Sequence, residues 1–295
     1  MTISISFLGG AGSIGASCAL VQIGGARLLI DCGVRFRGGA PLPDLAELQG
    51  KRLDAILVTH AHSDHSGGLP VAAEAFPAAP VYATPPTIDI VTILLRDALK
   101  LMGGSEREGD IPLYSESQLE RTLDALVPVH FDQPIRIGDV TVTFLAASHI
   151  LGAAMIHLAS EDGNVLFTGD YSVAAQRTVP ALGRPALPAD IVVSESTYGS
   201  RLHEDRAAAE QRLLNQLGEV LAGGGRVLIP AFAVGRAQEV LLILKQALRT
   251  ARIPDVPVFV DGMVRSVCDV YTRHPRYVSR GLLHALRKAG HGFYD

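Results

Sequence analysis

The sequence has few cysteines, no excess of basic residues and no long apolar run. Its three cysteines, Cys18, Cys32 and Cys268, are odd in number and widely spaced, which excludes a disulfide framework and a cysteine-based zinc motif. A reducing compartment, the cytoplasm, is the setting that we expect. No apolar run reaches the ~18 residues that a membrane span needs. The N-terminus has no basic region followed by an apolar core, so we expect no secretory signal.

The overall charge also excludes a strongly basic nucleic-acid binder, because 26 basic and 30 acidic residues give a net charge of −4. The charge is uneven, however. From Arg265 to the end, six basic residues stand against Asp269 and Asp295. A solvated helix face and a phosphate-binding surface both explain this excess, and the sequence leaves the two readings open.

Hydrophobic residues make up 48% of the 295 positions, which indicates a globular protein with a sizeable core. Period-two patterns and short apolar runs predict strands at 3–8, 19–23, 27–30, 54–59, 140–145, 154–158, 165–167 and 191–193. Helices are predicted at 84–102 and at 115–126, where Ser115 and Gln118 form a capping-box pattern. After residue 200 the pattern alternates: helix 204–221, strand 226–229, helix 233–248, strand 258–260 and helix 263–274. This alternation is typical of a parallel α/β unit, so we expect two domains, 1–199 and 200–295.

The most informative stretch is Thr59-His60-Ala61-His62-Ser63-Asp64-His65, which directly follows a buried-type strand. Imidazole nitrogens and a carboxylate oxygen are ligands that Zn²⁺ accepts. Four ligands this close in sequence cannot all serve one tetrahedral ion comfortably. His60 and His62 can converge on one ion, and Asp64 and His65 then point towards a second. The string therefore predicts a two-metal site, which is a chemistry suited to phosphate-ester hydrolysis.

A competing motif lies near the N-terminus. Gly10-Ala11-Gly12-Ser13-Ile14-Gly15 matches the dinucleotide-binding fingerprint, and Asp31 has about the right spacing for a ribose-binding acid. That fingerprint requires a helix after the third glycine. Gly24-Gly25 instead divides the following segment into two strand-like runs, and two glycines would cost a helix about 2 kcal/mol. We therefore expect a glycine loop near the site, with Asp31 supporting a metal ligand.

Two further strands end in ligand types. His149 follows one, where it can complete a three-histidine site, and Asp170 follows another, where its two oxygens can bridge two ions. Together the residues Asp31, His60, His62, Asp64, His65, His149 and Asp170 stand in the order that is found in the metallo-β-lactamase superfamily, which the sequence resembles. The resemblance implies an α/β fold, an αββα metallo-β-lactamase sandwich followed by a partial α/β cap. It also implies two Zn²⁺ ions: His60, His62 and His149 hold one, Asp64 and His65 hold the other, and Asp170 bridges them.

Ser194-Glu195-Ser196-Thr197-Tyr198-Gly199 resembles motif A of the β-CASP branch of that superfamily, and 229–239 is similar to a stretch of the β-CASP cap. The Glu-Ser-Thr form resembles the mRNA 3′-end processing endonuclease and its bacterial and archaeal RNA-processing relatives. The resemblance implies hydrolysis of single-stranded RNA by hydroxide from the dinuclear site. Asp64 and Glu195 would be catalytic, and Thr197 and Arg236 would contact substrate. A packed turn in which Arg236 pairs with a carboxylate is the alternative.

The sequence departs from the family at its C-terminal side. Family members continue through the cap and bring two further histidines, one of which ligates the second zinc, so we expect that site to be weak. Uncovered cap faces would favour a homo-oligomer or a complementing chain. Two other functions stay open: an inactive truncated scaffold or half-enzyme, and a small-molecule metallohydrolase such as a thioesterase or lactonase.

Overall fold

The computed structural model describes residues 2–103, 112–183, 187–290 and 292–294. The chain forms two compact units: the first contains Met1–Ala174 and Ala181–Glu195, and the second contains Ala175–Pro180 and Ser196–Asp295. The division into a metallo-β-lactamase-like domain, 1–199, and a cap domain, 200–295, stays a prediction. In the described part of the chain, no helix is both long and apolar enough to cross a bilayer.

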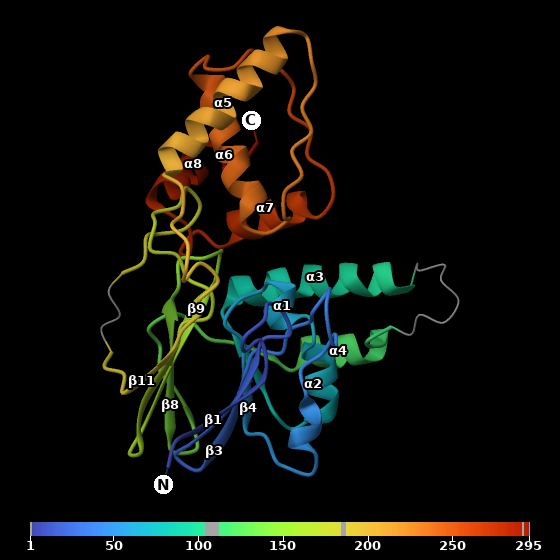
Figure 1. The fold of residues 1–295 in the computed structure, drawn as a ribbon, viewed down its shortest axis with the longest axis vertical. Helices are drawn as coiled ribbons and strands as arrows, with labels where there is room; N and C mark the ends of the chain where they lie inside the picture. Colours follow the sequence, from blue (N-terminus) through green and yellow to red (C-terminus); the bar gives the residue numbers. More distant parts are fainter. Residues whose placement is uncertain (1, 104–111, 184–186, 291, 295) are drawn as a thin grey trace. The chain divides into compact units, whose positions relative to one another are not determined.

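Among the described residues, the first sheet of unit 1 has six strands in the order in which they occur in the sequence. They are β1 (Ser4–Gly9), β2 (Cys18–Ile23), β3 (Ala26–Ile30), β4 (Ala55–Leu57), β5 (Val81–Ala83) and β6 (Leu126–Pro128). Strands β1, β3 and β4 of this sheet are labelled in Figure 1. The predicted hairpin is confirmed, because Gly24 and Gly25 both adopt positive φ angles, 54° and 76°, and join β2 to β3. From β3 to β6 the strands are parallel, so the carboxyl ends of β3 and β4 lie at the same edge.

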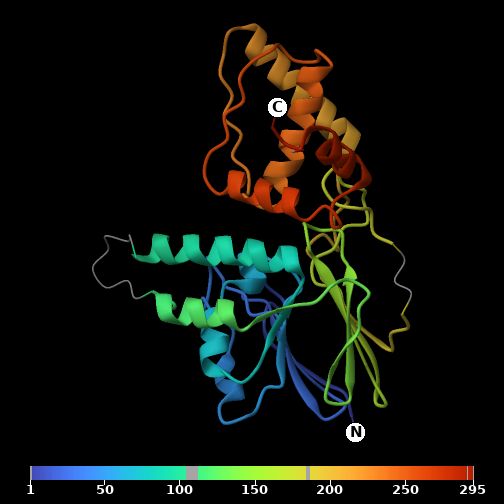
Figure 2. The same ribbon diagram turned by 180° about the vertical axis from the view of Figure 1, so that it is seen from behind.

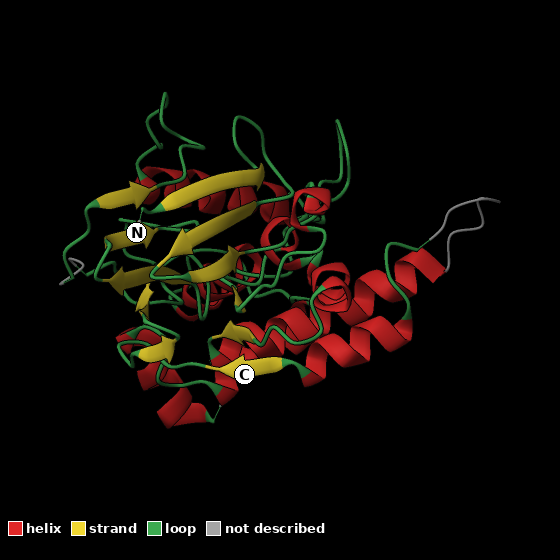
Figure 3. Ribbon diagram, turned by 90° about the horizontal axis from the view of Figure 1, so that it is seen from below, coloured by secondary structure: helices red, strands yellow, loops and turns green. Residues whose placement is uncertain are grey.

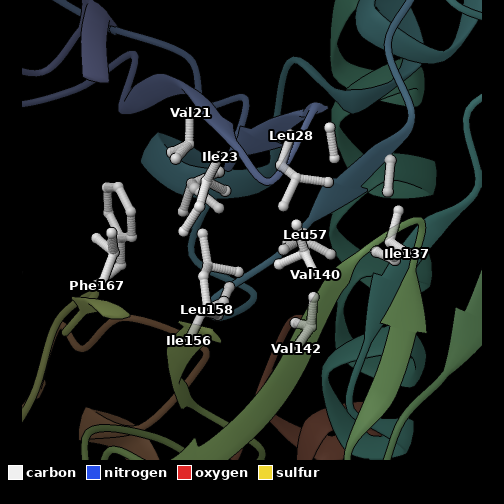
Figure 4. Packing of buried hydrophobic residues seen from close by; sticks show 14 of the residues in the cluster. Val21, Ile23, Leu28, Leu57, Ile137, Val140, Val142, Ile156, Leu158 and Phe167 are labelled. Atoms are coloured by element: carbon white, nitrogen blue, oxygen red, sulfur yellow. The ribbon is translucent and has the colours of Figure 1, made fainter. Parts of the chain in front are cut away.

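The second sheet has five strands in the order β11-β10-β9-β8-β7. They are β7 (Ile135–Ile137), β8 (Val140–Ala146), β9 (Ala154–Ser160), β10 (Gly163–Phe167) and β11 (Ile191–Val193). Side chains from both sheets meet in one apolar core: Val21 and Leu28 face Val142 and Ile156 (Figure 4). This burial holds the sandwich together, since each sheet removes an apolar face from water.

In the described part of unit 1 there are also one 3-10 helix and four α-helices. They are η1 (Leu45–Leu48), α1 (Ser63–Ser66), α2 (Leu69–Ala75), α3 (Pro85–Gly103) and α4 (Glu116–Asp124). Figure 2 shows the ribbon from behind, and Figure 3 colours the helices red and the strands yellow. The predicted capping box is confirmed at α4: Ser115 Oγ accepts from Gln118 N, and Gln118 Oε1 accepts from Ser115 N. The short helices α1 and α2 were not predicted, because each is too short to show a helical repeat.

The described residues of unit 2 form four helices: α5 (Arg206–Ala222), α6 (Arg236–Arg249), α7 (Val264–Arg273) and α8 (Arg280–Ala289). The first three match predicted helices, and α8 was not predicted. The predicted strands at 226–229 and 258–260 are wrong, because neither segment takes part in a ladder among the described residues. A strand needs a hydrogen-bonded neighbour, and these segments expose their apolar side chains instead: Leu228 is 88% and Phe259 90% exposed.

A short segment, Ala175–Pro180, belongs to unit 2 although both of its flanks belong to unit 1. We call it the strap. The buried Glu239 carboxylate accepts hydrogen bonds from the backbone N–H groups of Arg177 (3.1 Å) and Thr178 (2.7 Å) and pairs with Arg206. Ser279 N donates to the Thr178 carbonyl (2.9 Å), so α6 and the start of α8 both hold the strap.

Candidate metal centre

The strand ends of unit 1 deliver the predicted ligands. β4 leads into His60, His62 and the helix α1, which carries Asp64 and His65. β8 is followed by His149, and β10 by Asp170. Three chain segments that are far apart in the sequence therefore meet at one edge of the sandwich.

The backbone after β3 fixes the position of α1. Cys32 N donates to the His65 carbonyl and Val34 N to the Ser63 carbonyl, both at 2.9 Å. This contact needs Gly33, because a Cβ atom there would lie 1.6 Å from the Asp64 carbonyl oxygen. The glycine thus allows two backbone segments to approach closely and sets where Asp64 and His65 lie.

His60, His62, His149 and Asp170 each offer a ligand atom, and these atoms lie within 4.8 Å of one another. The Asp170 carboxylate faces two ways. Its Oδ2 lies 3.9 Å from His60 Nε2 and 3.7 Å from His149 Nε2, whereas its Oδ1 lies 3.3 Å from His65 Nε2. Asp64 Oδ2 is 4.0 Å from the same His65 nitrogen. One carboxylate therefore lies between two groups of ligand atoms, as a bridging ligand must.

Asp31 determines which ring nitrogen carries a proton in His65 and, through Thr59, in His60. Its carboxylate accepts from His65 Nδ1 at 2.7 Å and from the Thr59 hydroxyl at 2.7 Å. Since a carboxylate only accepts, His65 carries a proton on Nδ1. The Thr59 hydroxyl has used its own proton, so at 3.0 Å it accepts from His60 Nδ1. His60 can therefore turn an unprotonated Nε2 towards the site, which is the form that binds a metal. The His65 ring directs its Nε2 there as well, and this nitrogen binds a metal once it has lost its proton.

The buried His60 Nε2 has no hydrogen-bond partner. A buried polar atom without a partner costs about 1–3 kcal/mol, so its lone pair indicates that the site is built around a further group. Three imidazoles and a carboxylate match the ligand preferences of Zn²⁺ and similar divalent ions. The residues present thus fit a metal ion.

The pKa values of His60, His65 and Asp170 are shifted by burial and by one another's charges. Burial, and then the neighbouring His65 ring, lower the pKa of His60 well below its usual value. Burial also acts to lower the pKa of His65, but the carboxylates of Asp31 and Asp170 outweigh it and raise that pKa well above the usual range. Burial acts to raise the pKa of Asp170, yet the hydrogen bond and charge of His65 lower it overall. His60 is accordingly neutral at physiological pH, ready to act as a ligand.

Glu195 lies beside this centre rather than among its ligands. Its Oε1 accepts from Tyr171 N at 3.2 Å, and Tyr171 directly follows Asp170. The carboxylate therefore holds the backbone next to the bridging residue. Thr197 and Arg236 are exposed residues of unit 2, and their contact with substrate stays a prediction.

Sequence reasoning missed two polar residues. Thr59 links Asp31 to His60, and its position next to His60 in the motif was the available signal. Ser17 Oγ lies 3.5 Å from His65 Nε2, and no sequence pattern marks it. The dinucleotide alternative is wrong: the loop at 10–15 leads into β2, with no helix among the described residues between them.

The chain matches two family models: Metallo-beta-lactamase superfamily over residues 12–230, and Beta-Casp domain over residues 237–290. Transcription termination factor FttA of Methanothermobacter thermautotrophicus is 35% identical over 97% of this chain and 46% of its own length. An RNase J-like protein of Methanocaldococcus jannaschii is 31% identical over 94% of this chain and 62% of its own length. The chain thus spans about half the length of the curated relatives that it matches.

Among solved structures, a protein of unknown function from Enterococcus faecalis is similar in fold, with a TM-score of 0.57 and 16% identity. That similarity covers 92% of this chain and 68% of the other. The predicted α/β class is confirmed by the two sheets with their helices and by both family models. With the first model matching most of its residues, the chain belongs to the metallo-β-lactamase superfamily, and residues 237–290 match the Beta-Casp domain.

Proposed function

We propose that this chain is a zinc-dependent phosphodiester hydrolase that acts on single-stranded RNA. The observation that carries the proposal is the convergence of His60, His62, His149 and Asp170 around the unpartnered, buried His60 Nε2. Relatives named as a transcription termination factor and an RNase J-like protein support RNA as the substrate class. The β-CASP match in unit 2 supports the same class.

The ligand atoms form two groups that share one carboxylate. His60, His62 and His149 would hold one ion, Asp64 and His65 would hold another, and Asp170 would serve both through its two oxygens. A divalent ion in such a site supplies Lewis acidity, which stabilises charge on phosphoryl oxygens and lowers the pKa of water to about 7. Weak binding at the second position is expected, since three protein ligands among the described residues would serve it.

The residues of the chain have separate tasks in the proposed reaction. Asp64, whose side chain is 32% exposed, can accept a proton from the attacking water. Asp31 and Thr59 keep His65 and His60 in the tautomers that bind metal. Glu195 positions the backbone beside Asp170 through Tyr171 N, and in the proposed reaction its other oxygen would assist the leaving group.

The test is cleavage of end-labelled single-stranded RNA by the purified chain with Zn²⁺, beside Asp64→Asn and, as a matched control, Asp139→Asn. Asp139 is 91% exposed, so its substitution changes charge equally without touching the centre. Cleavage by the parent and the control, but not by Asp64→Asn, is the expected result. Equal cleavage by all three, or none by any, would refute the proposal for this chain and leave the scaffold or half-enzyme reading. Hydrolysis of a thioester or lactone in place of RNA would instead assign a small-molecule hydrolase.

A further inference from the structure

Helix α8 of unit 2 (Figure 1) has one apolar face and one cationic face. Leu282 and Leu286 are buried, whereas four residues on the opposite side are exposed: Arg280, His284, Arg287 and Lys288. At 3.6 residues per turn these four side chains lie within an arc of roughly 100°. The helix therefore presents a single solvent-facing surface whose charged groups are all cations. We call these four residues the cationic face.

The sequence around α8 contains nothing that would neutralise this face. No Asp or Glu occurs between Asp269 and Asp295, although the chain has 30 acidic residues in all. Since the whole chain carries −4 and the 270–294 segment carries +5, the remainder carries −9. The 270–294 segment is therefore basic, whereas the rest of the chain is acidic.

Some arginines elsewhere in unit 2 form ion pairs. Arg177 pairs with Glu210, and Arg212 pairs with Glu204. By contrast, no ion pair within the described ranges involves Arg280, Arg287 or Lys288. These cations repel one another without compensation, which destabilises the isolated chain slightly and favours an anionic partner.

The side chains of α8 indicate which anionic partner fits the cationic face. A membrane-surface helix buries its apolar face in lipid, but Leu282 and Leu286 are already buried inside unit 2. The face has no Phe, Tyr or Trp side chain that could stack on a base and no amide that could read one. Between Arg280 and Lys288 it extends about 12 Å, long enough to meet more than one phosphate of a nucleic-acid strand.

We propose that the cationic face of α8 contacts the phosphate backbone of single-stranded RNA, without reading sequence. The inference rests on the proposed function for the choice of RNA. None of the four residues contributes a ligand to the metal centre, so binding and cleavage can be tested separately.

The experiment measures binding of a fluorescent single-stranded RNA to the full chain in EDTA, at several salt concentrations. The triple variant R280Q/R287Q/K288Q is compared with R212Q/R249Q/R252Q, which removes three other exposed cations of unit 2 and changes the net charge equally. Glutamine keeps helix propensity, and all six positions are exposed, so both variants should fold.

For three lost phosphate contacts, the slope of log K against log salt should become less negative by about 2, at ~0.7 per contact. Affinity near 0.1 M salt should fall on the order of 100-fold. The control triple should change affinity less than about threefold, and R280K/R287K, which keeps the charge, should bind as the parent does.

If both triple variants weakened RNA binding equally, the attraction would be a general electrostatic one and the assignment to α8 would be overturned. An unchanged slope of log K against log salt in the α8 variant would overturn it as well. Competition by polyglutamate as effective as that by RNA of equal charge would assign an acidic protein partner and overturn it too. Cleavage by the parent with normal binding by the α8 variant would refute this inference alone. Binding through α8 without any cleavage would support it while the proposed function fails.

Discussion

Replacing Asp31 by asparagine should lower stability and change which nitrogen of His65 carries the proton. Asp31 adopts a positive φ of 60°, which asparagine tolerates better than most residues, so the substitution adds no backbone strain. It removes only the negative charge and one acceptor atom. The effect can therefore be assigned to the hydrogen bonds of this side chain.

The magnitude follows from three hydrogen bonds of 2.7 Å, donated by Thr59 N, the Thr59 hydroxyl and His65 Nδ1. Hydrogen bonds to charged groups contribute about 1.5–3 kcal/mol and neutral ones about 0.5–1.5 kcal/mol. An asparagine can keep all three contacts by reorienting the partners, so each loses about 1 kcal/mol. We expect the free energy of unfolding of the metal-free protein to fall by about 3 kcal/mol.

The amide nitrogen that replaces one carboxylate oxygen is a donor, so His65 Nδ1 must accept and Nε2 must carry the proton. A protonated Nε2 cannot bind metal, and Zn²⁺ affinity at the ion served by His65 should fall about 10–100-fold. Urea unfolding in EDTA and zinc titration measure the two effects, with Asp139→Asn as the exposed control. Stability within about 0.5 kcal/mol of the parent, together with unchanged zinc affinity, would refute the hydrogen-bond account of Asp31.

Three further predictions concern the scaffold. Burial raises the pKa of Tyr114 from 10 to about 12, and its hydroxyl donates to the Leu95 carbonyl, so its stabilisation is complete below pH 10 and is lost between pH 10 and 12. At pH 7, Tyr114→Phe should therefore be less stable than the parent by about 1 kcal/mol. As the pH rises to 12, the parent should lose up to about 2 kcal/mol of stability and the variant should not. Thermal unfolding above pH 11 should thus find the variant more stable than the parent. Glu239→Gln should lower the free energy of unfolding by about 2–4 kcal/mol, since it removes a buried charge that pairs with Arg206. Glu204→Gln, at the surface, should change that free energy little. Equal effects of the two substitutions in urea unfolding would contradict this prediction. Phe144→Ala, at a fully buried core position, should cost about 3–5 kcal/mol by the same assay, and a loss below 1 kcal/mol would show that the sandwich repacks.

The sequence allowed prediction of features that depend on local pattern. The hairpin at Gly24-Gly25 and the capping box at Ser115 follow from backbone chemistry over a few residues, and both are present. The position of the candidate ligands at strand ends was also predictable, because an apolar run followed by His or Asp can be recognised without knowing which segment pairs with it. What the sequence could not show is which strand end meets which, because that depends on long-range pairing.

The wrong and the missed predictions also depend on long-range pairing. The segments 226–229 and 258–260 have strand-like composition, but a strand exists only when another segment pairs with it, and none among the described residues does. Asp31 sets the tautomer of His60 through Thr59, which lies 28 residues further along the chain. This effect depends on a distance of 2.7 Å between the Thr59 hydroxyl and the Asp31 carboxylate. Such contacts are decided by tertiary packing, which one-dimensional patterns do not encode.

The strap makes unit 2 discontinuous along the gene. Because Ala175–Pro180 lies in that unit while its flanks lie in unit 1, no single cut in the chain can release an intact second unit. A recombinant protein beginning at Ser196 would leave the buried Glu239 without the two N–H donors that the strap provides. Exchange of this unit between relatives, by an engineer or by recombination, therefore needs two crossover regions that change together.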